Sequence, residues 1–325
     1  MKKYFTSPRS FYHGIMFHHF HDNRKYNKAQ GSISKNEFIK IINLIGKKNI
    51  INADIFIKKL KANKLKKNEV CLTFDDGLKC QFDVIHPVLK KLKIKAFFFI
   101  YTSIFEKKPD LLEVFRYFRT TYFKKIDDFY KYFFNFCSSK NIDLSSIIKN
   151  EKKEILKKKN IFPFYTYNDI LFRIIRDKYL KRNQYEKIMI NLMKNKDFNY
   201  KEIFNKLFLS TKELKELASF GHNIGLHSHS HPTTMSKLPK QKQKFEFTKN
   251  NKILTKKIKS KINSMSHPCG SYNLNTKKIL NDLDIEIGFR SNMKKSQNSK
   301  IINNSKFEIA REDHANILNL IKKNV

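Results

Sequence analysis

The chain has 325 residues, which is enough for one large domain or two average domains with a sizeable buried core. Hydrophobic residues make up 40% of the chain and aromatic residues 14%, so the composition excludes a disordered polymer. Gly and Pro number only 8 and 7, which excludes collagen-like and linker-dominated chains. The sequence has no apolar run long enough for a transmembrane helix, so we expect no membrane-spanning segment.

The net charge of +38 suggests a nucleic-acid-binding protein at first sight. However, the basic residues are 58 Lys and only nine Arg, whereas surfaces that bind phosphates and bases usually use Arg as well. Lys is spread along the chain together with abundant Asn, Ile and Phe, a bias typical of an AT-rich genome. We therefore expect a solvated Lys-rich surface and no specific nucleic-acid partner. The alternative is a basic face that attracts acidic glycans or nucleotide-linked sugars.

The four cysteines are scattered and show no metal-binding or redox spacing. They are Cys71, Cys80, Cys137 and Cys269. Four reduced cysteines in a chain of this length fit a reducing compartment. The first twenty residues contain lysines but no apolar segment of signal-peptide length. The sequence thus predicts a cytoplasmic protein.

Strand-like and helix-like segments alternate over the first part of the chain. In order, they are a strand with a His-rich loop at 12–22, a helix at 34–46 with a capping box of Ser34 and Glu37, an amphipathic stretch at 53–65, a buried strand at 69–74, a helix with Pro87 in its first turn, and a strand at 94–100. A strand, a helix and a strand at this spacing favour a parallel sheet.

The pattern changes between about 105 and 210, where the sequence is long, helical, and rich in Lys and aromatic residues. Apolar side chains recur at intervals of three and four residues over one stretch, which predicts one helix face. They are Phe115, Phe118, Tyr122, Ile126, Phe129, Phe133 and Phe136. We expect this face to form the core of a helical insertion. The alternative is a lid or a platform on which a sugar stacks.

The alternation of strands and helices then returns. The segments are a helix that begins at Ser210 and ends at Gly221, a strand and loop at 222–232, helices within 252–262 and 276–283, and strand-like stretches at 262–273, 285–291 and 307–313. Polar residues repeatedly follow these strands, and sites at the carboxyl ends of parallel strands are the rule for α/β barrels.

Two polar clusters could carry chemistry. Asp75 and Asp76 stand side by side at the end of an apolar strand, so one could bind a cation while the other acts as a base. A structural turn or a helix N-cap is the other explanation for this pair. His227 and His231 are spaced i and i+4, in a short polar loop, and can point at one ion. With Asp76 as the third ligand, such a site keeps open positions, as catalytic metal sites do.

These motifs resemble those of the polysaccharide deacetylase family, the NodB-homology domain of carbohydrate esterase family four. Its first motif is similar to Thr73–Gly77, its second to His227–Pro232, and a variant of its third to Met265–Asn273. Residues 15–22 resemble the strand that precedes the first motif in a subgroup with an N-terminal extension. The resemblance covers most of 12–105 and 210–315 and leaves the helical segment unmatched.

The resemblance implies an α/β fold, a distorted (β/α) barrel of about seven parallel strands with a mainly helical insertion at about 105–210. The whole chain, 1–325, would form a single polysaccharide deacetylase domain. It also implies a divalent metal, with Zn²⁺ the best guess, bound by Asp76, His227 and His231. Asp75 would be the general base. The backbone N–H of Cys269 would donate to the oxyanion, with Pro268 and Tyr272 beside it in the third motif.

Several positions depart from the family pattern. The third motif lacks the Arg that orients the base in compact members, and Arg311 could pair either with Asp75 or with substrate. Cys269 stands where an aromatic residue is common, and a catalytic cysteine is a remote alternative. His314 is the candidate general acid, against a surface histidine. We expect His18 to line the pocket, although a buried structural histidine is nearly as plausible.

The activity implied is metal-dependent hydrolysis of an acetyl group, most often N-acetyl and less often O-acetyl, from a sugar. In a cytoplasmic protein the partner would be an acetylated sugar, a glycan, or a nucleotide-linked or lipid-linked intermediate of a surface glycan. The alternative is a non-catalytic carbohydrate-binding protein on the same fold. That alternative would be favoured if a metal ligand were missing, but all three are present.

Overall fold

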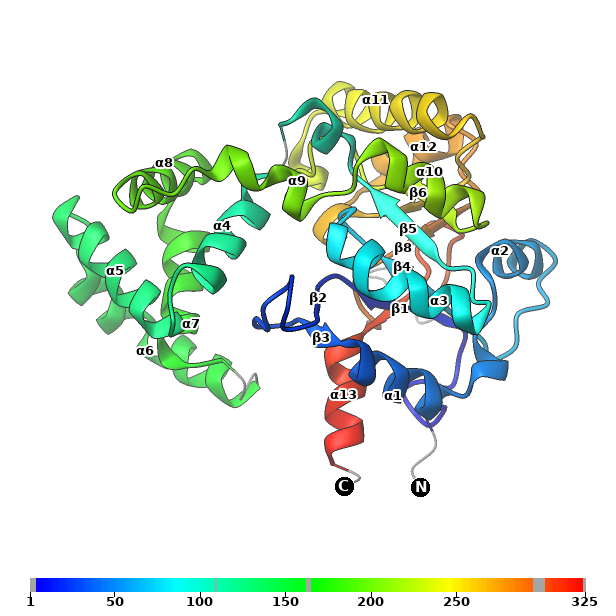
Figure 1. Ribbon diagram of the computed structural model, residues 1–325, viewed down its shortest axis with the longest axis horizontal. Coiled ribbons are helices and arrows are strands. Elements are labelled where there is room, and N and C mark those ends of the chain that lie inside the picture. Colours follow the sequence, from blue (N-terminus) through cyan, green and yellow to red (C-terminus); the bar gives the residue numbers. More distant parts are fainter. Residues whose placement is uncertain (1–3, 109, 162–164, 295–301, 324–325) are drawn as a thin grey trace. The chain divides into compact units, whose positions relative to one another are not determined.

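The computed structural model of the chain describes residues 4–108, 110–161, 165–294 and 302–323. They divide into two compact units, one formed by residues 1–110 and 205–325 and the other by residues 111–204 (Figure 1). We call them the barrel unit and the helical unit. The helical unit falls within the segment of 105–210 that the sequence sets apart. That the whole chain is one domain with an insertion stays a prediction.

Seven parallel strands form the sheet of the barrel unit. In the order in which they pair, these strands are β8 (Ile287–Phe289), β7 (Ser264–Ser266), β6 (Asn223–Leu226), β5 (Phe97–Ile100), β4 (Val70–Phe74), β1 (His13–Phe17) and β9 (Arg311–Asp313). Two short strands, β2 (Phe20–His21) and β3 (Ile33–Ser34), pair separately. The prediction of a parallel sheet is confirmed.

The two edge strands of this sheet approach each other. Phe289, the last residue of β8, forms a parallel bridge with Ile309, which lies just before β9. The N–H of Ile309 donates to the carbonyl oxygen of Gly288 (2.9 Å), and the N–H of Arg290 donates to that of Ile309 (2.8 Å). These bonds nearly close the sheet, so the predicted distorted (β/α) barrel is confirmed.

Helices accompany the strands of the barrel unit (Figure 1). They are α1 (Lys35–Ile45), α2 (Ala53–Lys61), α3 (His86–Leu92), α10 (Thr211–Ser219), α11 (Lys240–Ile258), α12 (Leu274–Asp282) and α13 (His314–Lys322), while α9 (Phe204–Leu207) lies at the boundary of the two units. Ser34 with Glu37 and Ser210 with Glu213 form capping boxes that start α1 and α10. The predicted capping box and the predicted end of α10 are therefore confirmed.

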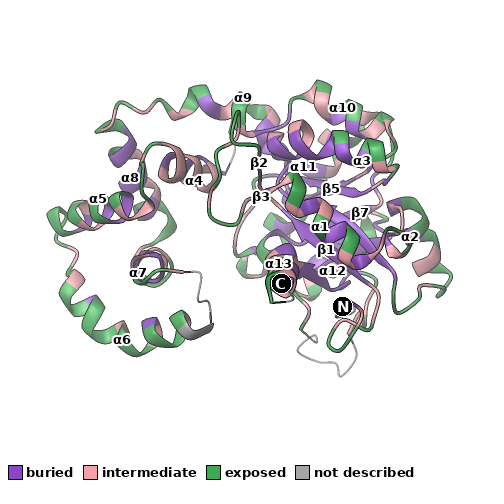
Figure 2. Cartoon of the chain, turned by 60° about the horizontal axis from the view of Figure 1, so that its bottom comes forward, coloured by how far each residue is buried: buried purple, intermediate pink, exposed green. Residues whose placement is uncertain are grey.

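The strands are buried on both faces, as Figure 2 shows by their colour. Side chains alternate between the two faces. Phe97 and Phe99 of β5 join Phe289 and, from α2, Phe56 in one apolar cluster. Phe98, between them, stacks on Phe74 with ring centroids 4.7 Å apart and belongs to the larger cluster against the helices. The apolar runs of the sequence thus build a sheet with a core on each side.

Crowding on one face of the sheet explains a glycine in β6. A Cβ atom built on Gly225 would lie 2.4 Å from Ser264 Oγ and 2.5 Å from a ring carbon of Phe99. Neither contact is possible without a shift of the strand or the ring. Gly225 therefore lets β5, β6 and β7 pack closely, directly below the loop that carries His227.

The helical unit consists of α4 (Leu111–Thr121), α5 (Ile126–Ser139), α6 (Leu144–Ile161), α7 (Tyr167–Ile174) and α8 (Arg182–Lys194). The prediction of a single helix face over 115–136 is wrong, because the chain leaves the helix between α4 and α5. Asp127 and Asp128 in the first turn of α5 favour a new N-terminus there. Phe115, Phe118, Phe129 and Phe133 are nevertheless fully buried, so the predicted aromatic core is confirmed.

Two further expectations concern cysteines and membranes. All four cysteines are free thiols, three of them buried and Cys269 exposed. Every helix in the described ranges is too short or too polar to cross a bilayer.

Candidate active site

The acidic pair follows β4 at the carboxyl end of the barrel. Asp75 continues the strand, and its N–H donates to the carbonyl oxygen of Phe17 (3.1 Å). Asp76 has a φ of 76°, in the left-handed region, and Gly77 follows at 64°. A non-glycine residue rarely adopts this conformation. The turn that it makes gives the two neighbouring carboxylates different surroundings.

Asp76 lies beside the two predicted histidine ligands. Its Oδ1 atom is 3.3 Å from His227 Nε2 and 3.4 Å from His231 Nε2. The three ligand atoms lie within 4.8 Å of one another, and all three side chains are buried or nearly so. His227 follows β6 directly, and His231 lies four residues later in the same loop with a φ of 55°. The structure therefore brings the predicted triad together.

The partners of the two histidines place the proton of each neutral ring on Nδ1. His227 Nδ1 lies 2.9 Å from the carbonyl oxygen of Ser266, which only accepts, so Nδ1 carries the proton. His231 Nδ1 likewise donates to the Asp110 carboxylate, 3.0 Å away. In neutral imidazoles the two Nε2 atoms are then lone-pair donors, as metal ligands require. Carboxylate and carbonyl partners on the other ring nitrogen are typical of metal-bound histidines.

An unpartnered oxygen tests whether a metal fits this arrangement. Asp76 Oδ1 is buried and accepts no hydrogen bond within the described part of the chain. When the two imidazoles are neutral, the Nε2 atoms that it faces carry lone pairs, so three electron-pair donors converge on one point. A buried carboxylate oxygen without a partner is costly. A divalent cation would satisfy all three groups, and two imidazoles with one carboxylate suit Zn²⁺.

Asp75 is held by an arginine from the last strand. Arg311 Nη1 donates to Asp75 Oδ1 and Nη2 donates to Oδ2, both at 2.7 Å. Ser266 Oγ, at 3.3 Å, is the other partner of Oδ2. Burial by itself would raise the pKa of the Asp75 carboxyl, but the Arg311 guanidinium lowers it below its usual value. The carboxylate is therefore fixed in orientation and stays ionised at neutral pH.

Arg311 uses every donor that it has inside the protein. Besides Asp75, its N–H groups donate to the carbonyl oxygen of Arg290 (2.6 Å), Thr73 Oγ1 (3.2 Å) and Ser266 Oγ (2.7 Å). Its side chain is only 1% exposed. Of the two sequence-based alternatives, the structure therefore pairs Arg311 with Asp75 and leaves it no donor for substrate.

The two histidines proposed near the pocket are placed differently. His18 Nε2 lies 3.9 Å from Asp75 Oδ2 and 4.0 Å from Asp76 Oδ2, and its side chain is 28% exposed. His314 begins α13, is buried, stacks on Phe17, and donates from Nδ1 to the carbonyl oxygen of Met16 (3.2 Å). Among the described contacts, none joins His314 to the triad or to Asp75. His18, not His314, thus lies at the site.

The third motif follows β7. Cys269 is exposed and has a φ of 51°, so the turn that it forms is left-handed. Pro268 is buried. Tyr272 stacks on His267 with centroids 4.1 Å apart, and its hydroxyl donates to Glu308 (2.8 Å). These contacts fix the motif, and the substrate and oxyanion roles expected for Cys269, Pro268 and Tyr272 stay predictions.

Two side chains of helix α11 accept hydrogen bonds from the loop that carries His227 and His231. Glu246 accepts from the backbone N–H groups of His229 (2.9 Å) and Ser230 (2.7 Å). Asn250, one turn later, accepts from the N–H of His227 (3.0 Å) and donates to the carbonyl oxygen of Ile100 (3.0 Å). We call these two side chains the loop clamp.

Sequence reasoning missed the loop clamp, Ser266 and Asp110. The clamp left a signal, because Glu246 and Asn250 lie at the helical spacing of the buried Phe247 and Leu254, where apolar residues are expected. Ser266 stood in the third motif without an assigned role. Asp110 left no signal, because 121 residues separate it from His231 in the sequence.

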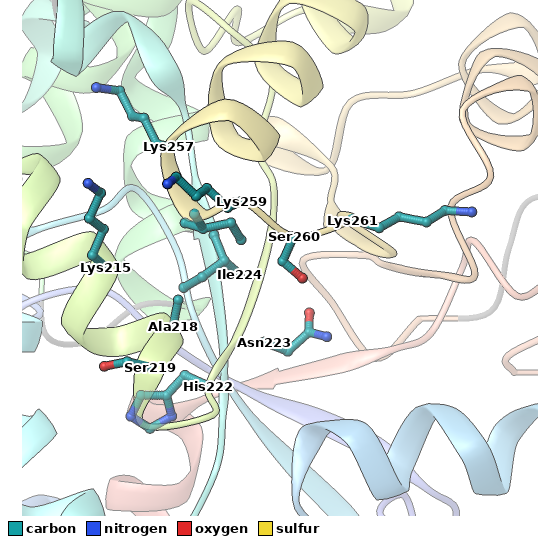
Figure 3. Close-up of a pocket in the computed structure, with 11 residues that line it drawn as sticks. Lys215, Ala218, Ser219, His222, Asn223, Ile224, Lys257, Lys259, Ser260 and Lys261 are labelled. Atoms are coloured by element: carbon teal, nitrogen blue, oxygen red, sulfur yellow. The ribbon is translucent and has the colours of Figure 1, made fainter.

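A cavity of about 440 Å³ lies at the other end of the barrel. It is lined by residues at the ends of α10 and α11 and at the beginning of β6, among them Lys215 and Lys259 (Figure 3). Asn223, the first residue of β6, and His222 just before it line this cavity, whereas His227 follows the opposite end of the strand. The cavity is therefore separate from the triad.

A parallel barrel with its polar side chains at the carboxyl ends of the strands is the arrangement of (β/α)-barrel enzymes. The sequence profile of the polysaccharide deacetylase family matches residues 62–117 and 177–288, which is more than half of the chain. The chain belongs to this family. Membership implies a hydrolase that acts on acetylated carbohydrates, and the resemblance seen in the motifs is confirmed.

Solved structures of deacetylases share the fold. The chain is 15% identical to deacetylase PplD of Streptococcus pyogenes, solved with acetate, with a TM-score of 0.54 and coverage of 94% of this chain and 96% of that one. A de-N-acetylase from Aggregatibacter actinomycetemcomitans is 16% identical, with a TM-score of 0.53 and coverage of 97% of this chain and 99% of that one. IcaB from Ammonifex degensii is 12% identical, with a TM-score of 0.51 and coverage of 95% of this chain and 98% of that one. A search of curated proteins gave no match. At these identities the structures establish the fold alone.

Proposed function

We propose that the chain is a metal-dependent deacetylase that removes an acetyl group, in the first place N-acetyl, from a sugar or surface-glycan intermediate. One observation carries the proposal. Three electron-pair donors converge at Asp76, His227 and His231, and the neighbouring Asp75 is an ionised carboxylate locked by Arg311. Both the metal ligands and a base are needed for metal-assisted hydrolysis, and they lie on the loops after β4 and β6, at the same end of the barrel.

Asp76, His227 and His231 would hold the metal, with Zn²⁺ favoured by the ligand set. When bound, the ion polarises the acetyl carbonyl and lowers the pKa of water. The protein contributes the orientation of the ligands. Ser266 and Asp110 fix the two imidazole rings, and the left-handed turn at Asp76 directs its carboxylate to them.

Asp75 is the proposed general base. It would take a proton from the water that attacks the acetyl carbon, because it stays ionised next to Arg311. The two hydrogen bonds from Arg311 hold the carboxylate in the plane of the guanidinium group, so the carboxylate cannot rotate away from the water. Oδ2 accepts from both Arg311 and Ser266, whereas the only described donor to Oδ1 is Arg311, so Oδ1 retains a lone pair that can receive the proton.

His18 is the proposed general acid, in place of His314. An amine leaves poorly unless its nitrogen is protonated, so amide hydrolysis needs a proton donor near the leaving group. His18 lies close to both aspartates, and its Nε2 atom is too far from either for a hydrogen bond. It is partly exposed, whereas His314 is buried and bonded to the backbone.

The third motif supplies the remaining roles. The backbone N–H of Cys269 would donate to the oxyanion that forms when water attacks the carbonyl. The left-handed turn at Cys269 supports this role, because such turns present backbone N–H groups to anions. Pro268 and Tyr272 would border the bound sugar. The substrate would be an acetylated glycan or a nucleotide-linked or lipid-linked sugar, and the cytoplasmic location stays a prediction.

The alternative function is non-catalytic carbohydrate binding on the same fold. The buried pair of Arg311 and Asp75 speaks against it, because a binding protein has no need for an ionised carboxylate held beside three metal ligands. The two functions differ in acetate release, which only the enzyme performs.

The test uses the purified protein stripped of metal with a chelator. Acetate release is measured on N-acetylglucosamine oligomers, UDP-N-acetylglucosamine and an O-acetylated sugar, before and after addition of Zn²⁺. We expect release only with the metal and none from the His227→Ala variant. Absence of release from every substrate, together with saturable binding of one of them, would favour the carbohydrate-binding alternative.

A further inference from the structure

The cavity of about 440 Å³ at the beginning of β6 is lined mostly by basic and polar side chains. Four of the lining residues are lysines, namely Lys215 of α10 and Lys257, Lys259 and Lys261 at the end of α11 and just beyond it (Figure 3). Within the part of the chain that the structure describes, none of the lining residues is acidic. The volume lies in the range of roughly 300–1,000 Å³ that is typical of sites for small molecules. The cavity is therefore a candidate site for an anion.

Most of these lysines have no counter-charge from the protein. In the described ranges, the one ion pair that the four form is that of Lys261 with Asp284 (3.3 Å), between two exposed groups. The two carboxylates of α10 pair with other lysines, Glu213 with Lys79 and Glu216 with Lys90. Lys215 and Lys259 are exposed and keep an uncompensated positive charge. Their amino groups and that of Lys257 point to the same side of the close-up in Figure 3.

Lys257 is the least exposed of the four lysines. Its Nζ atom donates to Thr211 Oγ1 (2.8 Å) and lies 4.5 Å from the ring centroid of Phe105. Partial burial lowers the pKa of Lys257, and the positive charges of Lys215 and Lys256 lower it further. Like charges thus repel one another at this side of the cavity, and a bound anion would relieve the repulsion.

Lys95 adds a further cation beside the cavity. Gly221, with a φ of 93°, precedes His222, which is one of the lining residues. A Cβ atom built on Gly221 would lie 2.9 Å from both Cε and Nζ of Lys95, so the lysine occupies the space that a side chain would fill. Burial, His86 and the positive charge of Lys95 lower the pKa of His222 to about 3. Among the described residues Lys95 forms no ion pair, so its charge adds to that of the cavity lysines.

The rest of the cavity wall is partly apolar. Both ring nitrogens of His222 are engaged inside the protein, since Nδ1 accepts from the N–H of Ala96 (3.0 Å) and Nε2 lies 3.0 Å from His86 Nδ1. The neutral ring of His222 lines the cavity together with Ala218, Ile224 and Ile258. An organic group can therefore contact this wall while the lysines hold an anion.

The end of a helix explains only part of this arrangement. Cations in the last turn stabilise the negative end of a helix dipole, and Lys256 and Lys257 stand in the last turn of α11. Lys215, however, lies in the middle of α10, and Lys95 lies between α3 and β5. The helix dipole does not account for these two positions, whereas a shared anion does.

We propose that this cavity binds a diphosphate carried by a small organic molecule. Lysines are compact charges with three rotatable donors, which suit the oxygens of a phosphate, and the lining has no Arg fork to match a carboxylate. A phosphate monoester carries a charge of about −1.5 to −2, so the four amino groups of Lys95, Lys215, Lys257 and Lys259 match a second phosphate as well. The proposal goes beyond the deacetylase function and does not depend on it.

The test measures binding by calorimetry on the full-length chain at constant ionic strength. The metal is removed first, so that a diphosphate cannot bind to an ion at the triad. The probes are pyrophosphate, UDP, geranyl diphosphate and uncharged uridine. We expect saturable binding of one diphosphate per chain and none of uridine. Stronger binding of UDP than of pyrophosphate would identify a nucleotide as the carrier, and stronger binding of geranyl diphosphate an isoprenoid.

Lysine variants locate the anion. Lys215→Met and Lys259→Met should each weaken pyrophosphate binding about tenfold, the effect of losing one charge-assisted hydrogen bond. Lys244→Met is the matched control, because Lys244 is exposed on α11 about 20 Å along the helix from Lys257. It removes the same charge and should change binding by less than about twofold. Absence of saturable binding, or an equal loss in Lys244→Met, would mean that only the general surface charge attracts the anion and would overturn the proposal.

The diphosphate site and the triad can fail separately. Lys215→Met should lose pyrophosphate affinity and keep both the metal and acetate release. His227→Ala should lose acetate release and bind pyrophosphate as the unaltered chain does. Loss of pyrophosphate binding in His227→Ala would place the anion at the triad and contradict the assignment to the cavity.

Discussion

Asp75 and Asp76 are neighbours in sequence with unlike environments. Asp75 accepts two hydrogen bonds from Arg311, so its charge is balanced inside the protein. Asp76 faces two imidazole nitrogens, and its Oδ1 atom accepts no hydrogen bond from the described residues. For Asp76, burial alone would raise the pKa of the carboxyl, but the surrounding histidines lower it well below its usual value. One carboxylate is therefore suited to accept a proton and the other to hold a cation.

Asparagine at each position should separate the two roles. Asp75→Asn keeps the shape but removes the base, so it should retain the metal and lose turnover by roughly 10²–10⁴. Asp76→Asn removes a charged ligand, so metal affinity itself should fall. Metal analysis beside acetate release on both variants checks this. Metal loss in Asp75→Asn with retention in Asp76→Asn would mean that the roles are reversed.

Asp110 should tune the metal through His231. It accepts the Nδ1 proton of His231 at 3.0 Å, which fixes the ring and makes Nε2 a better ligand. Asp110→Asn should lower Zn²⁺ affinity by about 10–100-fold, the usual effect of losing such a partner. A competition assay with a chromogenic chelator measures it. Unchanged affinity would show that Asp110 does not orient the ligand.

The site residues that the sequence revealed are those in short contiguous motifs. Asp75, Asp76, His227 and His231 stand in two such motifs, and residue types with known chemistry made them visible. The partners of these residues come from elsewhere in the chain, since 236 residues separate Asp75 from Arg311 and 121 separate Asp110 from His231. Spacing alone could not decide between Arg311 pairing with Asp75 and contacting substrate, and it could not show that His314 is buried and bonded to the backbone.

At the scale of elements, loops after parallel strands carry the site and a helix fixes one of them. The loop that follows β6 contains left-handed Ser228 and His231, with φ of 65° and 55°, which is strained for both residue types. The loop clamp of Glu246 and Asn250 on α11 holds that loop through backbone N–H groups. The strain is therefore maintained by an element outside the motif.

Asn250→Ala should disturb this loop. It leaves the N–H of His227 and the carbonyl oxygen of Ile100 without their partner, which should reduce the free energy of unfolding by about 1–3 kcal/mol and weaken metal binding. Asn251→Ala is the matched control on the same helix, since the one side-chain hydrogen bond described for Asn251 is the bond that it accepts from Thr255 on the same helix. Urea unfolding and metal titration of both variants check the prediction. Equal losses of stability and of metal affinity in the two variants would show that Asn250 does not hold the loop.

Elements were more predictable than their ends. The spacing of apolar residues and the capping box found α1, and the helix that ends at Gly221 was found in the same way. The aromatic stretch at 115–136 keeps its helical spacing across the break between α4 and α5. Because both helices bury their aromatic side chains in one core, the periodicity did not reveal the turn between them.

At the scale of the whole molecule, the order of the strands follows the chain except at the closure. β4 to β8 pair in sequence order, while β9 pairs with β1 and approaches β8. Local pattern predicted parallel strands, but the register at Phe289 and Ile309 depends on packing around the whole barrel. The closure places Arg311, the first residue of β9, next to Asp75.

Buried histidines should make the fold sensitive to acid. Burial lowers the pKa of His222 to about 3 and that of His13 to about 4. Unfolding restores the ordinary value near 6.5, so between pH 6.5 and 4 the unfolded state binds more protons than the folded state. The free energy of unfolding should therefore fall as pH falls through this range, by up to about 1.4 kcal/mol per pH unit for each such histidine.

Urea unfolding of the metal-free protein between pH 7.5 and 5 measures this slope. His222→Asn, whose amide oxygen can accept the Ala96 N–H that His222 Nδ1 accepts, should show a slope smaller by up to one proton. Equal slopes for the variant and the unaltered protein would show that His222 is not held neutral.

The central claim is that Asp76, His227 and His231 bind a metal that the deacetylase reaction requires. Titration of the metal-free protein with Zn²⁺, with acetate release followed on its best substrate, tests it most directly. The account predicts that activity rises in proportion to bound metal and reaches its plateau at one ion per chain, and that His231→Ala neither binds the ion nor releases acetate. Full activity in the metal-free protein, or tight stoichiometric zinc in His231→Ala, would contradict it.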